Sequence, residues 1–110
     1  MRFSQPHMII GWKLNADGSY VTTLSKNTSA SITQTDLEIR SGSLTANADN
    51  IRVINGIVDD GELVLVGGKL DQKVTGTGNL TIDGNVSTNA DYIGVSGKNT
   101  VNAGKTESCV

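Results

Sequence analysis

Apolar and polar residues alternate in short stretches along the chain, and each stretch ends at a glycine. The pattern apolar-x-apolar-x-x-Gly-x-apolar occurs three times with identical spacing, starting at Leu37, Ile51 and Leu63. A version one residue shorter starts at Leu80, and its first part recurs at Ile93. Side chains alternate between the two faces of a strand, and glycine bends the backbone without a Cβ penalty. Each unit therefore predicts two short strands around a glycine bend.

The fold class predicted from this pattern is all-β. Helix signals are nearly absent, because no window places apolar residues at helical spacing among good helix formers. One unit cannot bury its apolar face alone, so the units are expected to stack on one another. Stacked hairpins, a β-prism or β-helix, and a sandwich all satisfy the pattern. The units follow one another closely and at irregular intervals, which favours hairpins or a multi-chain prism over the longer coils of a single-chain solenoid.

The first part of the chain has a different pattern. Residues 9–24 place apolar side chains on both sides of a turn at Asp17-Gly18, which predicts an N-terminal β-hairpin. We divide the single all-β domain, residues 1–110, into an N-terminal arm and hairpin (1–35), repeated strand-glycine-strand units (36–104) and a tail (105–110).

The composition predicts a hydrophobic core with little apolar side-chain volume. The chain of 110 residues contains 36% hydrophobic residues, and only four residues are aromatic. The core is therefore expected to consist of small aliphatic side chains, which supports a single domain of this size poorly. Cys109 is the only cysteine and cannot form an internal disulfide. We expect the chain to gain stability by self-association as a homo-oligomer, with a trimer as one option.

The charge pattern argues against nucleic acids and membranes as partners. The net charge is −2, and the nine basic residues are scattered singly, whereas phosphate binding needs a clustered basic face. The N-terminal sequence lacks the hydrophobic stretch of a secretory signal, and no run of about 18 apolar residues could span a bilayer. We expect a protein that is made in a cytoplasm.

Nothing in the residue pattern predicts catalysis. His7 is the only histidine and lies far from Cys109 in the sequence, so we expect no pair of nucleophile and base. Asp59, Asp60 and Glu62 are the densest acidic group, and Asp-Asp-Gly is typical of a hairpin turn. Calcium binding at these acids is an open alternative. We predict no enzyme activity, no catalytic residue, no metal site and no cofactor.

A candidate partner-binding surface lies in the predicted hairpin. Trp12 and Tyr20 are large aromatic residues on this arm, with Ile9 and Ile10 beside them. Aromatic side chains contribute much of the binding energy at protein interfaces. These four residues are therefore the predicted contacts with a partner.

Two resemblances to known families narrow the range of functions to be considered. KLNADGSYVTTL, residues 13–24, resembles a stretch near the start of a trimeric capsid-decoration protein of tailed bacteriophages, which has a similar Ala-Asp-Gly-x-Tyr-Val step. The remainder resembles, in kind, the Gly/Thr/Asn-rich β-prisms and β-helices of phage decoration, spike and fibre proteins. This resemblance implies a virion part that binds a lattice or a receptor and does no chemistry.

The second resemblance is to bactofilins, whose cytoplasmic β-solenoids polymerise end to end. NLTIDGNV and YIGVSGKNTV resemble their apolar-x-apolar-x-Gly rungs, although bactofilin coils are longer and more uniform than the spacings here. Our leading hypothesis is a non-enzymatic bacteriophage virion component, a capsid decoration or cement protein or a spike or fibre, which binds itself and a protein lattice. The alternative is a bacterial filament-forming or adhesive β-solenoid, located in the cytoplasm rather than the virion.

Overall fold

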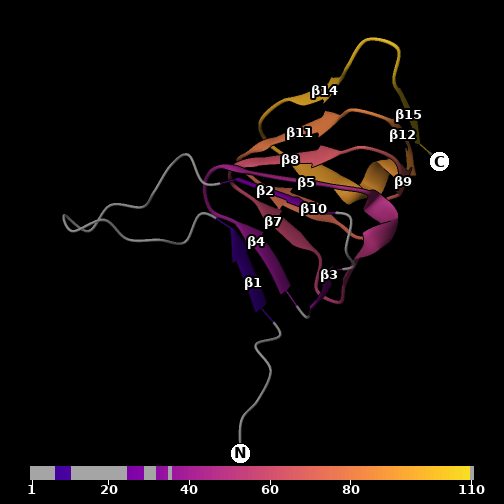
Figure 1. The fold of residues 1–110 in the computed structure, drawn as a ribbon. Coiled ribbons are helices and arrows are strands. Elements are labelled where there is room, and N and C mark those ends of the chain that lie inside the picture. Colours follow the sequence, from indigo (N-terminus) through magenta and orange to yellow (C-terminus); the bar gives the residue numbers. More distant parts are fainter. Residues whose placement is uncertain (1–6, 11–24, 29–31, 35, 110) are drawn as a thin grey trace, which may run out of the picture.

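The computed structural model describes residues 7–10, 25–28, 32–34 and 36–109. The described part of the protein is all-β, and its parallel sheets form a β-solenoid of about four turns (Figure 1). Every strand pairing among the described residues is parallel. Of the arrangements that the sequence left open, the chain therefore adopts the β-helix.

Four sheets carry the strands of the solenoid, and each sheet collects one strand from each of several coils. The first sheet consists, in order, of β1 (His7–Ile10), β4 (Asp36–Ile39), β7 (Ile57–Asp59), β10 (Val74–Gly76) and β13 (Ile93–Val95). The second consists of β2 (Ser25–Thr28), β5 (Ser43–Ala46), β8 (Glu62–Leu65), β11 (Asn79–Ile82) and β14 (Asn99–Val101). The two smaller sheets consist of β9 (Gly68–Lys69), β12 (Asn85–Thr88) and β15 (Thr106–Cys109), and of β3 (Ile32–Gln34) and β6 (Ile51–Val53).

The coils are longer than the spacing of the sequence units suggests. On the first sheet Leu37 pairs with Ile57, Ile57 with Val74 and Val74 with Ile93, so each coil runs from one of these residues to the next. Successive sequence units begin on different sheets: the unit from Leu37 covers β4 of the first sheet and β5 of the second, whereas the next, from Ile51, covers β6 of the two-stranded sheet and β7 of the first. The inference that the units are too closely spaced for a single-chain solenoid is therefore wrong.

Columns of aliphatic side chains fill the inside of the solenoid. On the second sheet Leu44, Leu63 and Leu80 lie in register, and each is 0% exposed. The intervening positions on these strands, such as Thr45 and Thr81, are only partly buried, because side chains alternate between the two faces. No aromatic residue belongs to this core among the described residues. The prediction of a core built from small aliphatic residues is confirmed for the described part of the chain.

Glycine at one corner allows the coils to stack closely. Gly42, Gly61, Gly78 and Gly97 follow one another at the corner between the first and second sheets. A Cβ atom on Gly61 would lie 2.6 Å from the carbonyl oxygen of Gly42, and one on Gly78 or Gly97 would overlap the carbonyl oxygen of the glycine below it. The carbonyl oxygen of Gly42 also accepts a hydrogen bond from the Glu62 N–H at 2.9 Å. Gly42 and Gly97 are among the glycine bends predicted from the sequence units, whereas Gly61 and Gly78 lie outside those units' bends.

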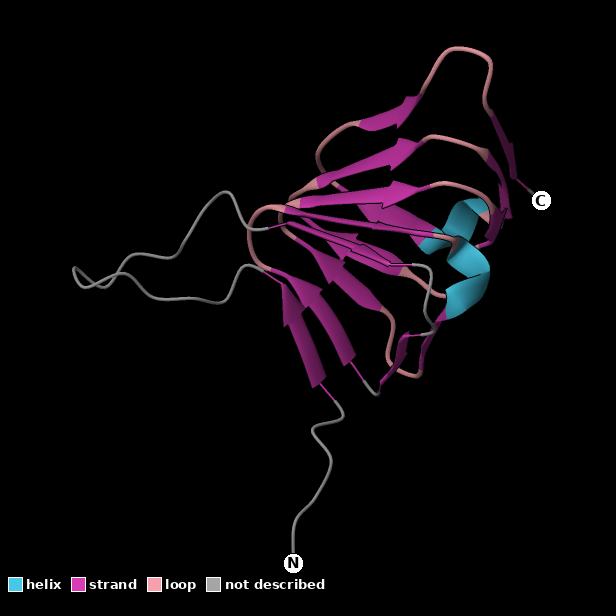
Figure 2. Cartoon of the chain, in the orientation of Figure 1, coloured by secondary structure: helices cyan, strands magenta, loops and turns pink. Residues whose placement is uncertain are grey.

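Two related 3-10 turns, η1 (Ala48–Asn50) and η2 (Ala90–Tyr92), lie on the same side of the solenoid (Figure 2). An asparagine caps the start of each turn: the Oδ1 atoms of Asn47 and Asn89 accept hydrogen bonds of 2.9 Å from the N–H groups of Asp49 and Asp91. Asp49 Oδ1 in turn accepts from the Lys69 N–H of the next coil at 2.9 Å. Asn47 thus marks the end of β5, and Asp49 connects this coil to the next one.

The two ends of the described chain belong to the outermost coils. β1, β2 and β3 pair with β4, β5 and β6, and β15, which falls in the segment assigned to a tail, pairs with β12. The connection from β1 to β2 spans residues 11–24 and is much longer than the connection from β4 to β5, residues 40–42. Most of the predicted hairpin falls in residues 11–24 and lies outside the described part of the structure.

A substitution at the stacked corner tests this packing. Gly78→Ala places a methyl group against the carbonyl oxygens of Gly61 and Asp59, so we expect the free energy of unfolding to fall by roughly 1–3 kcal/mol. Gly94→Ala is the matched control, because its Cβ would have its nearest neighbours at 3.1 and 3.4 Å and should be tolerated with a smaller loss. Urea unfolding followed by circular dichroism measures both. Equal losses for the two variants would contradict the stacked corner.

Candidate functional site

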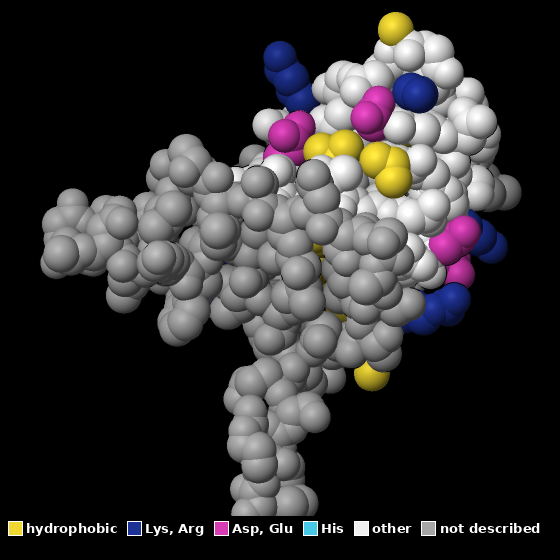
Figure 3. Space-filling model, viewed as in Figure 1, with side chains coloured by type: hydrophobic (Ala, Val, Ile, Leu, Met, Phe, Trp, Pro, Cys, Tyr) yellow, Lys and Arg dark blue, Asp and Glu magenta, His cyan; other side chains and the backbone are white. Residues whose placement is uncertain are grey.

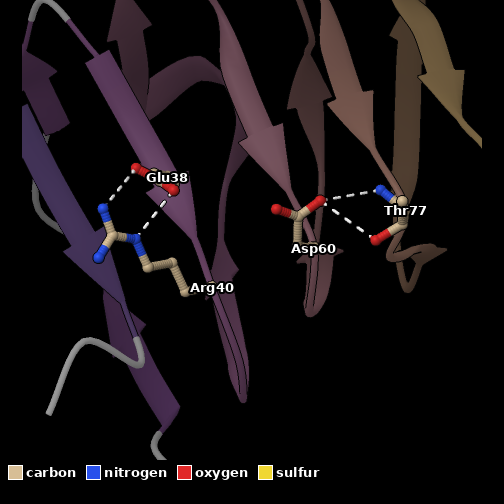
Figure 4. A network of polar contacts seen from close by, with 4 residues as sticks. All are labelled: Glu38, Arg40, Asp60 and Thr77. Atoms are coloured by element: carbon tan, nitrogen blue, oxygen red, sulfur yellow. Dashed lines mark hydrogen bonds and ion pairs between the residues drawn. The ribbon is translucent and has the colours of Figure 1, made fainter. Parts of the chain in front are cut away.

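The densest acidic group of the sequence forms the corner between β7 and β8. Asp60 is exposed there, and its Oδ1 accepts hydrogen bonds from the N–H of Thr77 at 2.9 Å and from its hydroxyl at 3.2 Å (Figure 4). Glu62 Oε2 accepts from the Thr81 hydroxyl at 2.8 Å. Asp-Asp-Gly thus makes a turn, as predicted, but the turn connects strands of two different sheets and not the strands of a hairpin.

The carboxylates of this corner do not converge on a common point. Asp60 and Glu62 are each bonded to a different threonine of the next coil. One coil earlier, Glu38 Oε2 lies 2.9 Å from Arg40 Nε (Figure 4). Within the described residues, no three His, Cys, Asp or Glu side chains are placed to hold a metal ion. The arrangement connects neighbouring coils.

Asp59 is the exception, because its side chain lies inside the solenoid. It is 0% exposed and pairs in register with Ile39 of the core. Its Oδ1 accepts from the Gly61 N–H at 3.1 Å, whereas its Oδ2 has no hydrogen-bond partner among the described residues. Burial raises the pKa of Asp59 to about 7; the Gly61 hydrogen bond partly opposes this rise, and the negative charges of Asp60 and Glu62 add to it. A carboxyl group in the core therefore titrates near neutral pH.

The two residues considered for nucleophilic chemistry lie in different coils. His7 is on β1 at one edge of the first sheet, in register with Asp36. Cys109 is exposed on β15, at the edge of another sheet, and lies in register with Thr88. The fold does not pair the strands that carry them.

Residues from three coils line one shallow groove. It includes Ile54, Asp71, Gln72, Lys73 and Tyr92. The Oε1 atom of Gln72 is buried and has no hydrogen-bond partner within the described chain. The described lining contains no histidine, serine or cysteine that could act as base or nucleophile.

Charges on the described surface are mixed. In the view of Figure 3, acidic and basic side chains lie close to one another, with a few hydrophobic side chains between them. In this view they form no single-sign patch of the kind that binds phosphate backbones. Among the described residues, no helix is long and apolar enough to cross a membrane.

Apolar side chains are also exposed on the last coil, which consists of β13, β14 and β15. We call its core-register positions the C-terminal face: Ile93, Val95, Asn99, Val101 and Glu107. In the coil below, the partners of these residues include Leu80 and Ile82, which are both 0% exposed. Val101, which continues the Ile82 column, is 42% exposed. The core columns thus continue to the end of the described chain without a cover.

A polar pair interrupts the C-terminal face. Asn99 continues the column of Leu44, Leu63 and Leu80, and Glu107 pairs in register with the buried Val86. Asn99 Nδ2 donates to Glu107 Oε1 across the end of the solenoid, at 3.1 Å. The end surface therefore combines apolar side chains with one carboxylate.

The partner-binding residues predicted from the sequence fall mostly outside this description. Trp12 and Tyr20 lie outside the described residues. Ile9 and Ile10 are on β1, where Ile9 pairs in register with Glu38 and Ile10 with Ile39 of the core. Their role in partner binding stays a prediction.

Sequence reasoning missed the C-terminal face because its signal depends on the register. Asn99 is one of many asparagines until the pairing of β11 with β14 places it above Leu80. The interruption of a leucine column by a polar residue is the feature that could have revealed it.

Comparison with protein-family models, with curated proteins and with solved structures found no match to this chain. The candidate site is therefore defined by its geometry.

The buried Asp59 predicts a dependence of stability on pH. Its pKa is about 7 in the folded chain, against an ordinary value of 3.8. The folded state thus binds the proton more tightly than the unfolded state, so stability is greatest at low pH and falls as the pH rises from about 4 to 7. Asp59→Asn removes this titration, and at pH 8 it should be more stable than the wild type by roughly 1–3 kcal/mol, since no buried charge is left without a partner.

Urea unfolding at pH 4, 6 and 8 measures the effect. Asp71→Asn, at a carboxylate whose side chain is 61% exposed, is the control and should show the wild-type slope. An Asp59→Asn variant that keeps the wild-type slope between pH 4 and 7 would refute the assignment.

Proposed function

We propose that the protein is a non-enzymatic structural protein that acts by self-association and by attachment to a larger protein assembly. The observation that carries the proposal is the exposed C-terminal face, where Val101 and its neighbours continue the core columns without a cover in the described chain. Burial of such apolar surface favours association. The strands of this coil also lie at the edges of their sheets, and an edge strand pairs readily with another chain.

The leading context for this function is the particle of a tailed bacteriophage, as a decoration, cement, spike or fibre protein. Support comes from the resemblance of residues 13–24 to a capsid-decoration protein and from the β-helical fold, which is of a kind found among virion parts. In this context the protein is located in the virion, and Trp12, Tyr20, Ile9 and Ile10 are the proposed contacts with the capsid lattice. No nucleic acid, membrane or cofactor takes part.

A second candidate is a bacterial filament-forming or adhesive β-solenoid, located in the cytoplasm. The observation that favours it is the pair of five-stranded sheets, β1 to β13 and β2 to β14, which have an open edge at both ends of the described chain. A solenoid with two open ends can grow along its axis.

We expect the purified chain of 11.5 kDa to elute as oligomers whose mass rises with protein concentration, as measured by size-exclusion chromatography with light scattering. Electron microscopy then separates the two candidates, because a filament former makes long fibres unaided and a decoration protein makes discrete oligomers. A stable, freely soluble monomer without affinity for any capsid would contradict both.

A further inference from the structure

The shallow groove lies where three successive coils enter the first sheet. The segments that precede β7, β10 and β13 occupy equivalent positions in these coils, because the three strands pair in register. Residues 53–56, residues 71–73 and Tyr92 of these segments line the groove. Its volume is about 280 Å³, which is near the lower limit of small-molecule sites. A ligand of this size is a small molecule or one unit of a longer chain.

One part of the lining is apolar. Ile54 is 82% exposed, so its side chain adds little to the core and presents its surface to solvent. Tyr92 lines the same groove and is partly buried. A tyrosine ring combines a large apolar surface with a polar hydroxyl group. Together these two side chains can pack against the C–H groups of a ligand.

The other part of the lining consists of hydrogen-bond acceptors. Gln72 Oε1 is buried and has no partner among the described residues, which is unfavourable for an acceptor. The last side-chain torsion of glutamine has a broad energy profile, so rotation of the amide can turn this oxygen toward the groove that Gln72 lines. Asp71 lines the groove as well, and its side chain is 61% exposed. The pair favours a ligand that donates hydrogen bonds.

These features together select the class of ligand. The lining contains one carboxylate, Asp71, and one ammonium group, Lys73, so it favours a ligand without net charge. A hydrocarbon would leave the Gln72 oxygen without a donor. An extended peptide would lack main-chain pairing here, because β7 and β10 are already paired on both sides. A neutral sugar ring supplies both an apolar C–H face and several hydroxyl donors.

We propose that the groove binds a neutral saccharide, with one sugar ring packed against Tyr92 and Ile54 and its hydroxyl groups donating to Gln72 Oε1 and the Asp71 carboxylate. The proposal concerns binding and not conversion of the saccharide. It goes beyond the proposed self-association and does not depend on it, because the groove is lined by corner segments and not by the C-terminal face. A single sugar ring in so open a groove should bind with a Kd on the order of 1 mM.

An NMR titration of the purified chain tests the proposal. The probes are the methyl glycosides of glucose, galactose, mannose and N-acetylglucosamine, and amide chemical shifts report both the Kd and the location of binding. At least one probe should shift the signals of residues 53–56, 71–73 and 92. The signals of β11 and β12, which belong to other sheets, should stay unchanged.

Substitutions in the groove test the roles of its side chains. Tyr92→Ala removes the ring and should raise the Kd about tenfold, whereas Tyr92→Phe keeps the ring and should stay within about twofold of the wild type. Gln72→Met removes the acceptor with little change of shape and should also raise the Kd about tenfold. Ile54→Ala should raise it about threefold. Val66→Ala is the matched control for Ile54→Ala, because Val66 is an apolar residue that is 42% exposed and is not part of the groove lining. It should bind like the wild type.

Circular dichroism verifies that each variant is folded, and the high exposure of Ile54 makes its variant the safest in this respect. Shifts confined to the groove, together with weaker binding by Tyr92→Ala and Gln72→Met, support the proposal. It is overturned if no glycoside binds the wild type, or if Ile54→Ala and Tyr92→Ala bind with the wild-type Kd. Tighter binding of glucuronic acid or glucose 6-phosphate than of the neutral glycosides would refute the neutral class. Light scattering measures self-association separately, so a failure of saccharide binding leaves the proposed function standing.

Discussion

The structure depends on the close approach of backbone to backbone at the corners of the coils. Parallel strands in a sheet lie about 4.8 Å apart, and a corner can follow the strands at this spacing only if no side chain intervenes. Gly61, Gly78 and Gly97 meet this condition, because the carbonyl oxygen of the coil below occupies the place where a Cβ atom would be. Hydrogen bonds such as that from Glu62 N–H to Gly42 O, at 2.9 Å, then connect one corner to the next.

Regular stacking has a consequence at the two ends. Inside the solenoid each aliphatic residue is covered by its equivalent in the next coil, as Leu63 is by Leu80. The last coil has no such neighbour in the described chain, so Val101 is exposed although the pattern of its column is that of the core. Asn99, which stands where the column has leucine in the coils below, limits the apolar area at this end. Its hydrogen bond to the Glu107 carboxylate adds a polar and charged group to the surface. Specific recognition commonly uses such buried or partly buried polar groups.

Asp59 shows how strongly the corner geometry constrains the core. The residue occupies a core-register position next to Ile39, yet its Oδ1 is needed to accept from the Gly61 N–H at the turn. The same side chain therefore supports a corner and leaves a buried oxygen without a partner in the described chain. Local rules of this kind are often violated at strained or functional positions. Here the consequence is electrostatic, because burial raises the pKa of Asp59 to about 7.

The sequence by itself determined the all-β class, the short strands, the glycine bends and the aliphatic core, because these follow from local alternation and from the absence of Cβ at positions such as Gly42 and Gly97. It could not determine the period of the coils, since identical units such as those from Leu37 and Ile51 begin on different sheets. Only the tertiary structure decided that Asp59 points inward, that Asn99 interrupts a leucine column and that Val101 of the last described coil is exposed. These features depend on pairing between residues a whole coil apart, and a register shift of one residue would move every side chain to the opposite face.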